Sequence, residues 1–95
     1  MPAYVIANVM VNDPVRYEDY RNLVLPTIEK FGGRFIVRGG AVEPLEGDWR
    51  PGRLVIVEFP SAEQARAWWH SPEYSAAKAI RQATSNGTLL IVEGV

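Results

Sequence analysis

Cysteine is absent from this chain of 95 residues, and its absence excludes several kinds of chemistry at once. Without cysteine the protein has no disulfide, no thiolate nucleophile, no iron–sulfur ligand and no sulfur-based zinc site. Histidine is nearly absent as well, because His70 is the only one, so no paired-histidine metal motif exists. We therefore expect neither a bound metal nor a cofactor.

Long apolar runs and an excess of one charge are also missing. The longest apolar runs, such as residues 89–92, are far too short to span a bilayer. The N-terminus lacks the basic start and the cleavage site of a signal peptide. A formal net charge of -1 without a basic run gives no general attraction to nucleic acid or to an anionic membrane. These features predict a cytoplasmic protein that binds neither nucleic acid nor membrane.

Hydrophobic residues make up 47% of the chain, which is typical of a globular protein, and the length favours a single domain over residues 1–95. Four segments rich in β-branched and aromatic residues predict strands. They are residues 3–11, 34–40, 53–60 and 88–95.

The first predicted helix follows the first predicted strand. Asp13 is a typical capping residue, and Pro14 suits the first helical position because its missing N–H has no partner there anyway. Apolar residues then recur every three or four positions, up to a glycine stop at residues 32–33. Pro26 interrupts this pattern and predicts a bend, since it cannot donate a hydrogen bond to the preceding turn.

The second helical region starts with a capping box, Ser61 followed by Gln64. A new start signal at Ser71-Pro72 divides it, and the sequence Asn86-Gly87 predicts its end. The resulting order is β-α-β-β-α-β. This order predicts an α+β, ferredoxin-like sandwich, in which one antiparallel sheet carries the helices on one face.

The predicted strands are apolar on both sides. In the last strand, Leu89 and Ile91 alternate with Leu90 and Val92, so neither face is polar. Helices cover only one face of such a sheet, and a bare apolar face is larger than soluble monomers usually tolerate. A homodimer with the two sheets face to face would bury it. The alternative is a monomer with an ordinary, partly apolar surface.

Two adjacent tryptophans, Trp68 and Trp69, precede His70 and the Ser71-Pro72 step. One interpretation makes His70 a general base or a metal or haem ligand. However, neighbouring helical residues point about 100° apart, so Trp69 and His70 do not share a face. We favour the second interpretation, in which this stretch joins two pieces of helix and a tryptophan anchors them to the sheet.

Three charged residues lie in predicted strands among apolar neighbours, namely Arg38, Glu58 and Glu93. Alternation places Arg38 in phase with Ile36. A functional interpretation makes them catalytic candidates in a small pocket, where Arg38 binds a carboxylate or enolate and a glutamate moves a proton. The alternative, which we favour, is a structural ion pair at a strand end or between subunits.

The segment 41–52 has two prolines, two glycines and little periodicity, and it predicts a loop. Loops of this length often act as a lid or a dimer arm. Its two large apolar residues, Leu45 and Trp49, would either close over a pocket or pack on a partner subunit. We favour the partner.

The chain resembles the small proteins of the domain of unknown function 1330 family, within the dimeric α+β barrel superfamily. The matching motifs are DPVRYEDY (13–20), FGGRFIVRGG (31–40), LEGDWRPGR (45–53), VEFPS (57–61), SPEY (71–74), Arg81 and VEG (92–94). The resemblance implies a ferredoxin-like dimer. The superfamily also holds cofactor-free monooxygenases, haem-degrading enzymes and lactone isomerases, but a shared fold transfers no reaction.

Two hypotheses about function remain. In the first, a small organic ligand binds in an apolar, aromatic-lined pocket, with Tyr20, Arg38, Trp69 and Tyr74 as its contacts. In the second, the protein is a cofactor-independent enzyme of the isomerase or monooxygenase type, acting on an enolisable substrate. The second requires a titrating group inside the pocket, and the first does not.

Overall fold

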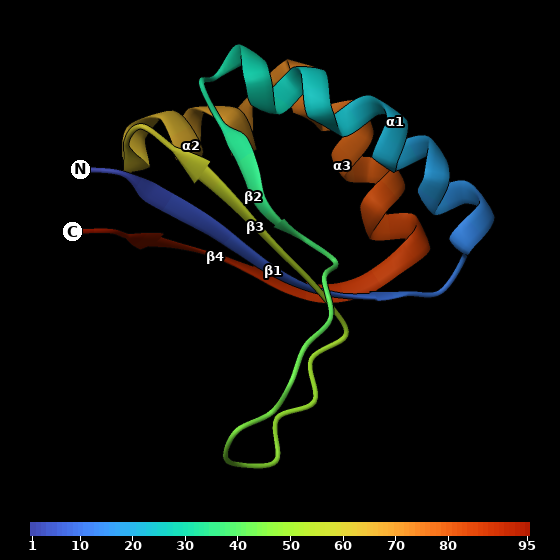
Figure 1. The fold of residues 1–95 in the computed structure, drawn as a ribbon. Helices are drawn as coiled ribbons and strands as arrows, with labels where there is room; N and C mark the ends of the chain where they lie inside the picture. The colour runs from blue at the N-terminus through green and yellow to red at the C-terminus, as the bar shows by residue number, and fades with distance from the viewer.

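The computed structural model describes residues 1–95 as four strands and three helices. In chain order they are β1 (Ala3–Val11), α1 (Pro14–Lys30), β2 (Arg34–Arg38), β3 (Arg53–Phe59), α2 (Ala62–His70), α3 (Pro72–Thr84) and β4 (Ser85–Glu93). The strands form one antiparallel sheet in the order β2-β3-β1-β4, and the helices lie on one side of it (Figure 1). The predicted α+β, ferredoxin-like architecture is confirmed.

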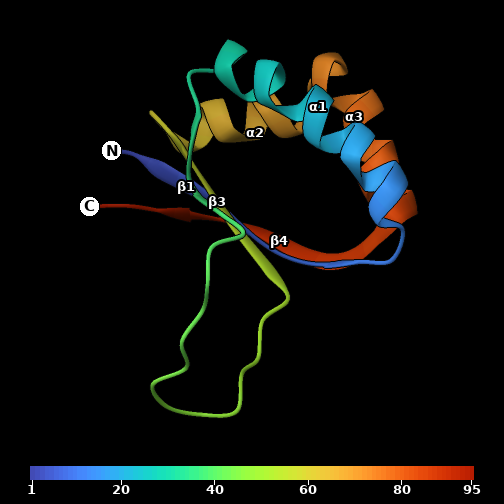
Figure 2. The same ribbon diagram turned by 45° about the vertical axis from the view of Figure 1, so that its right-hand side comes forward.

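Local signals set the ends of α1 as predicted. Asp13 Oδ1 accepts a hydrogen bond from the Arg16 N–H at 3.2 Å, and Pro14 occupies the first turn. Gly32 has a φ of 80°, a left-handed conformation that stops the helix and favours glycine. The helix continues through Pro26 and is curved along its length (Figure 2).

The division between α2 and α3 is confirmed and centres on Ser71. Its hydroxyl oxygen accepts a hydrogen bond from the Tyr74 N–H at 3.1 Å and its O–H donates to the Trp68 carbonyl at 2.7 Å. Ser71 therefore ends one helix and caps the next. His70 is the last residue of α2 and its side chain is exposed, as expected of a residue at a helix junction.

The predicted helix end at Asn86-Gly87 is wrong. Helix α3 ends at Thr84, where the Ser85 hydroxyl donates to the Arg81 carbonyl, and β4 starts at Ser85. Asn86 and Gly87 lie within β4, and Gly87 pairs with Val9 of β1. A Cβ at residue 87 would collide with the backbone of β1, so this glycine permits a close approach of strands and not a turn.

The core lies between the sheet and the helices. Its larger cluster has nine buried members: Val5, Val24, Ile28, Val57, Phe59, Ala65, Trp68, Tyr74 and Ala77. The Trp68 ring centroid lies 4.0 Å from that of Tyr74 and 5.5 Å from that of Phe59. Its indole Nε1 also donates to Thr27 Oγ1 of α1 at 3.1 Å. Trp68 of α2 thus contacts both the sheet and α1, and the predicted tryptophan anchor is confirmed.

The other face of the sheet, here called the open face, is covered by no helix. It carries Tyr4, Ile6 and Met10 of β1, Leu54 and Ile56 of β3, and Leu90 and Val92 of β4. Met10, Leu90 and Val92 are 48%, 55% and 43% exposed. Both faces of the sheet are therefore apolar, as the sequence predicted.

A bulge in β2 changes the direction of one predicted site residue. Phe35 pairs with Val57 and Val37 pairs with Ile56, so the register shifts by one residue between them. After this shift Arg38 pairs with Val55, whose side chain faces the helices. Regular alternation from Arg34 would have placed Arg38 on the side of Glu58, whereas after the bulge Arg38 points toward the helical layer.

The segment between β2 and β3 is a loop, as predicted, and it extends to the side of the sheet away from the helices (Figures 1 and 2). Leu45 and Trp49 in it are 92% and 63% exposed. The two chain ends lie side by side, because Ala3 pairs with Glu93 and the Gly94 N–H donates to the Pro2 carbonyl at 2.8 Å. None of the three helices is both long enough and apolar enough to cross a membrane.

Candidate functional site

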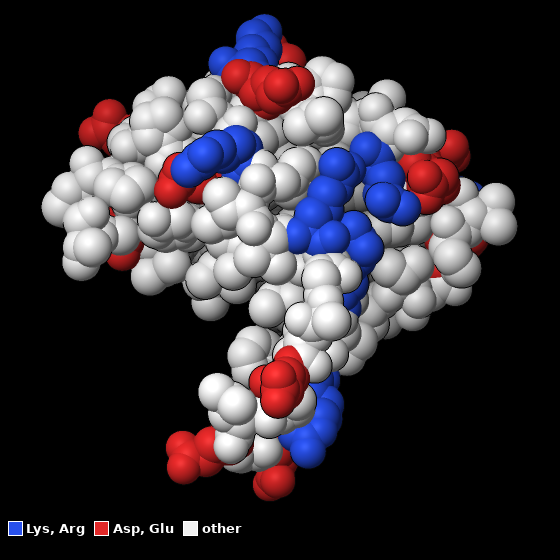
Figure 3. All heavy atoms as spheres, viewed as in Figure 1, with Lys and Arg blue, Asp and Glu red and all other residues white.

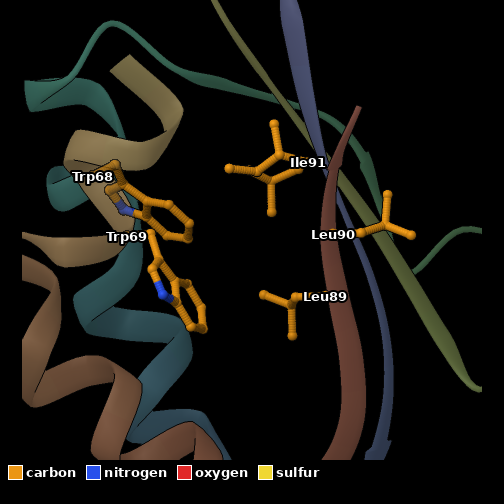
Figure 4. A pocket seen from close by; sticks show the side chains of 6 residues that line it. Trp68, Trp69, Leu89, Leu90 and Ile91 are labelled. Atoms are coloured by element: carbon orange, nitrogen blue, oxygen red, sulfur yellow. The ribbon is translucent and has the colours of Figure 1, made fainter. Parts of the chain in front are cut away.

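A cavity of about 320 Å³, here called the apolar cavity, lies between α2 and the edge strand β4. Every residue that lines it is hydrophobic: Val5, Trp68, Trp69, Leu89, Leu90 and Ile91. The side chains of Leu89 and Ile91 point toward the two indoles, whereas Leu90 points to the other side of β4 (Figure 4). Strand alternation thus gives this cavity two aliphatic side chains on one wall and two indoles on the opposite wall.

The two tryptophans take different roles because adjacent helical residues diverge. Trp68 is 2% exposed and belongs to the core, while Trp69 is only partly buried. Lys78 of α3 holds Trp69 in place, since its Nζ lies 4.3 Å from the Trp69 ring centroid and donates to the Trp69 carbonyl at 2.9 Å. The indole of Trp69 is therefore fixed at the cavity and available for stacking with a ligand.

A chain of hydrogen bonds connects α1 to α3 behind this cavity. The Tyr20 and Tyr74 hydroxyl groups are 3.1 Å apart, and Arg81 Nε donates to the Tyr74 hydroxyl oxygen at 3.3 Å. Burial raises the pKa of Tyr20 far above its usual value, and the neighbouring Tyr74 raises it further. Tyr20 therefore keeps its proton and acts as a hydrogen-bonding group, not as a base.

A second, smaller cavity of about 40 Å³ lies between α1 and the sheet. Four arginines from four different elements line it, and we call it the arginine cavity. They are Arg21 of α1, Arg38 of β2, Arg53 of β3 and Arg81 of α3. Basic side chains gather in one patch between α1 and the base of the loop (Figure 3). No acidic residue lines this cavity.

The four predicted ligand contacts lie on the helix side of the sheet, around these two cavities. Tyr20 and Arg38 line the arginine cavity, and Trp69 lines the apolar cavity. Tyr74 is buried between them, with its ring centroid 6.4 Å from that of Tyr20 and 6.0 Å from that of Trp69. Leu89 lines both cavities, so they adjoin at β4.

The catalytic candidates do not come together. Glu58 lies on the open face, and its Oε1 accepts a hydrogen bond from Arg34 Nε at 2.9 Å. Glu93 is exposed at the end of β4 and forms no ion pair within the chain. Arg38 points to the opposite side of the sheet from Glu58, and it lies on the opposite edge strand from Glu93. No cavity contains either glutamate together with Arg38.

Sequence reasoning missed Arg21, Arg53 and Arg81 as site residues. Arg53 is in phase with Val55 and Val57, and Arg81 follows Tyr74 and Ala77 on the buried face of α3. The sequence could have indicated both arginines, because a charged residue in phase with inward-facing apolar residues needs a partner. No comparable signal marked Arg21, which occupies an exposed position on α1.

Solved structures with the same fold come from several bacteria. A protein of unknown function from Rhodopseudomonas palustris is 21% identical with a TM-score of 0.80, over 99% of this chain and 82% of that one. A dimeric ferredoxin-like protein of unknown function from Jannaschia sp. CCS1 is 14% identical with a TM-score of 0.71, over 99% and 100%.

A third structure is that of SnoaB, a cofactor-independent oxygenase from Streptomyces nogalater. It is 10% identical with a TM-score of 0.69, over 99% of this chain and 93% of that one. At these identities the similarity shows the fold alone. A search of the curated proteins gave no match. The family described as "Domain of unknown function (DUF1330)" matches residues 2–95, and this chain belongs to that family.

Proposed function

We propose that this protein is a homodimer that binds a small, largely apolar organic molecule in the apolar cavity. The observation that carries the proposal is the lining of this cavity, which is entirely hydrophobic around a volume of about 320 Å³. Cavities that hold small organic ligands are typically about 300–1,000 Å³ and mostly apolar. A planar ligand fits best, because Trp69 offers a ring held by Lys78 for stacking.

The open face supports the homodimer. Its apolar side chains have no cover within the chain, and a second copy would bury them in a self-complementary contact. Related structures include a protein described as dimeric and ferredoxin-like. The loop extends toward the same side, so in such a dimer Leu45 and Trp49 would pack on the partner subunit and not over a cavity.

The geometry favours binding over proton-transfer catalysis. A cofactor-independent enzyme needs a group in the site that gains or loses a proton at working pH. The apolar cavity contains no ionisable side chain. Tyr20, which lines the adjoining arginine cavity, keeps its proton because burial raises its pKa. The enzyme hypothesis therefore lacks a carboxylate or a histidine, the usual general bases, in the lining of either cavity.

A fluorescence titration tests the proposal. The uncharged dye N-phenyl-1-naphthylamine brightens in apolar surroundings, and we expect one dye molecule to bind per subunit. Ile91→Phe places a larger side chain in the cavity and should weaken binding by about tenfold. The matched control is Val15→Phe, which adds the same ring at a position on α1 that is 81% exposed. The control should leave affinity unchanged.

Two results would contradict this proposal. The first is a titration without saturation for the unmodified protein. The second is equal affinity for Ile91→Phe and Val15→Phe, which would place the bound dye elsewhere on the surface.

A further inference from the structure

The arginine cavity contains more positive charge than the protein itself neutralises. Arg21 has a carboxylate partner, Glu18, at 3.2 Å. The single hydrogen bond of Arg38 is a long one of 3.4 Å to the Arg21 carbonyl. Arg53 and Arg81 form no ion pair. Three guanidinium groups therefore line one small space without an acidic partner.

Arg53 has the least favourable position. Its Nε is buried and has no hydrogen-bond partner. The backbone beside it is shaped to make room, because Gly39 has a φ of 71° and a Cβ there would collide with the Arg53 guanidinium. The Arg53 guanidinium therefore lines the cavity although no group of the chain accepts a hydrogen bond from its Nε.

Arg81 is similar and still more buried, with an exposed fraction of 5%. Its single hydrogen bond, from Nε to the Tyr74 hydroxyl, involves a neutral acceptor. An arginine side chain stays protonated in proteins, so this positive charge persists. An unpaired charge in such surroundings is costly, and so are like charges close together. An external anion would remove both costs.

We propose that the arginine cavity binds the oxyanion group of a small molecule, either a carboxylate or a phosphate. Arginine suits such groups because its N–H donors match their paired oxygens. A volume of about 40 Å³ admits the anionic group and little else. The rest of the molecule lies in an adjoining open groove of about 410 Å³, which shares Arg21 and Arg38 with the cavity.

The adjoining groove indicates what kind of molecule carries the anion. It runs along α1 and is lined mainly by polar residues, among them Glu18 and Asn22. A polar carboxylate or a phosphate ester fits this lining better than a long apolar chain. The arginine cavity adjoins the apolar cavity at Leu89, but none of its arginines lines the apolar cavity, so either proposal can fail without the other.

Calorimetric titrations with sodium phosphate and with sodium acetate test this site, each against sodium chloride of matched ionic strength. We expect saturation at one anion per subunit. The stronger of the two probes identifies the class, a phosphate ester or a carboxylate. Arg53→Gln should weaken binding at least about tenfold. Arg66→Gln is the matched control, because it removes the same charge from an exposed position on α2 outside every cavity.

A melting experiment separates an anion site from a merely structural role of Arg53. In dilute chloride, Arg53→Gln should raise Tm above that of the unmodified protein, because it removes a buried Nε without a partner and one of the positive charges that line the cavity. Saturating phosphate or acetate should reduce this difference. Arg38→Gln, at an exposed position, repeats the binding test if Arg53→Gln does not fold.

The proposal is overturned if neither probe binds beyond the chloride control. It also fails if both arginine variants bind as tightly as the unmodified protein, or if Arg53→Gln melts at a lower temperature in dilute chloride.

Discussion

The Tyr74 hydroxyl is the meeting point of two helices and one buried charge. It accepts from Arg81 Nε at 3.3 Å and lies 3.1 Å from the Tyr20 hydroxyl, and its own residue is fully buried. Arg81 has no carboxylate partner, so the neutral Tyr74 oxygen is the acceptor that stabilises its guanidinium within the chain. Tyr74, a core residue, therefore contacts residues that line both cavities: Tyr20 and Arg81 on one side and Trp69 on the other.

Tyr20 makes stability depend on pH in the alkaline range. Its pKa in the folded protein is raised by burial, so above about pH 10 the unfolded chain loses this proton while the folded protein keeps it. The free energy of unfolding should then fall with rising pH by about 1.4 kcal/mol per pH unit from this residue, and Tyr20→Phe should remove that part. Urea unfolding at pH 9, 10 and 11 measures the free energy of unfolding of both proteins. An equal dependence of this free energy on pH in the unmodified protein and in Tyr20→Phe would contradict the prediction.

The junction of α2 and α3 is a single residue, Ser71, whose hydroxyl forms two hydrogen bonds. Ser71 is 5% exposed, and its hydroxyl satisfies the Tyr74 N–H and the Trp68 carbonyl. These two residues are the largest fully buried side chains of the core. The angle between the two helices therefore positions the aromatic core as well as the wall of the apolar cavity.

Replacing this cap should cost more than replacing an exposed one. Ser71→Ala leaves the buried Tyr74 N–H without a partner, although the Trp68 carbonyl keeps its hydrogen bond from the backbone N–H of residue 71. We expect the free energy of unfolding to fall by about 2 kcal/mol. Ser61→Ala is the matched control, because the Ser61 cap accepts from the Gln64 N–H at 3.2 Å in more exposed surroundings. We expect about 1 kcal/mol or less for it. Chemical denaturation of both variants measures the difference, and equal losses would contradict this account of the junction.

The molecule as a whole has one helical side and one bare apolar side. Val92, on the open face, is 43% exposed, and Leu23, on α1, is 47% exposed. In the proposed homodimer the first is buried by the partner and the second stays in solvent. Because the two side chains are similarly exposed, a lysine at either position should change the stability of the subunit by a similar amount. Only the lysine at residue 92 would lie in the proposed dimer contact.

Val92→Lys should give particles of 10.6 kDa at micromolar concentration, whereas the unmodified protein and Leu23→Lys should have twice that mass. Light scattering coupled to size-exclusion chromatography measures these masses. A subunit-sized mass for the unmodified protein would remove the homodimer from the proposal, and a dimeric Val92→Lys would place its contact on another surface.

Much of the fold could be predicted because its signals are local. The Asp13 cap, the Gly32 stop and the Ser71 cap all depend on a few neighbouring residues, and all three are confirmed. The Asn86-Gly87 pair failed for the opposite reason. A turn signal there was overridden by pairing of Gly87 with Val9, which is far away in the sequence.

The sites were less predictable because they depend on how distant elements meet. The face that Arg38 occupies is set by a one-residue bulge against β3, and strand alternation contains no sign of it. Likewise, Arg21, Arg53 and Arg81 come from three elements that only the sheet order and helix packing bring together. An apolar, aromatic-lined pocket was predicted, but only Trp69 of its four predicted contacts lines the apolar cavity. The wall at Leu89 and Ile91 required the register of β4.

The adjacent chain ends have a consequence for how such a protein can be encoded. Because the Gly94 N–H donates to the Pro2 carbonyl, a few added residues suffice to join Val95 to Met1 into a closed ring. That ring can be reopened in the loop around Gly47, where no strand or helix is interrupted. The same architecture is therefore compatible with a circular permutant in which β3 is the first strand of the chain and β2 the last.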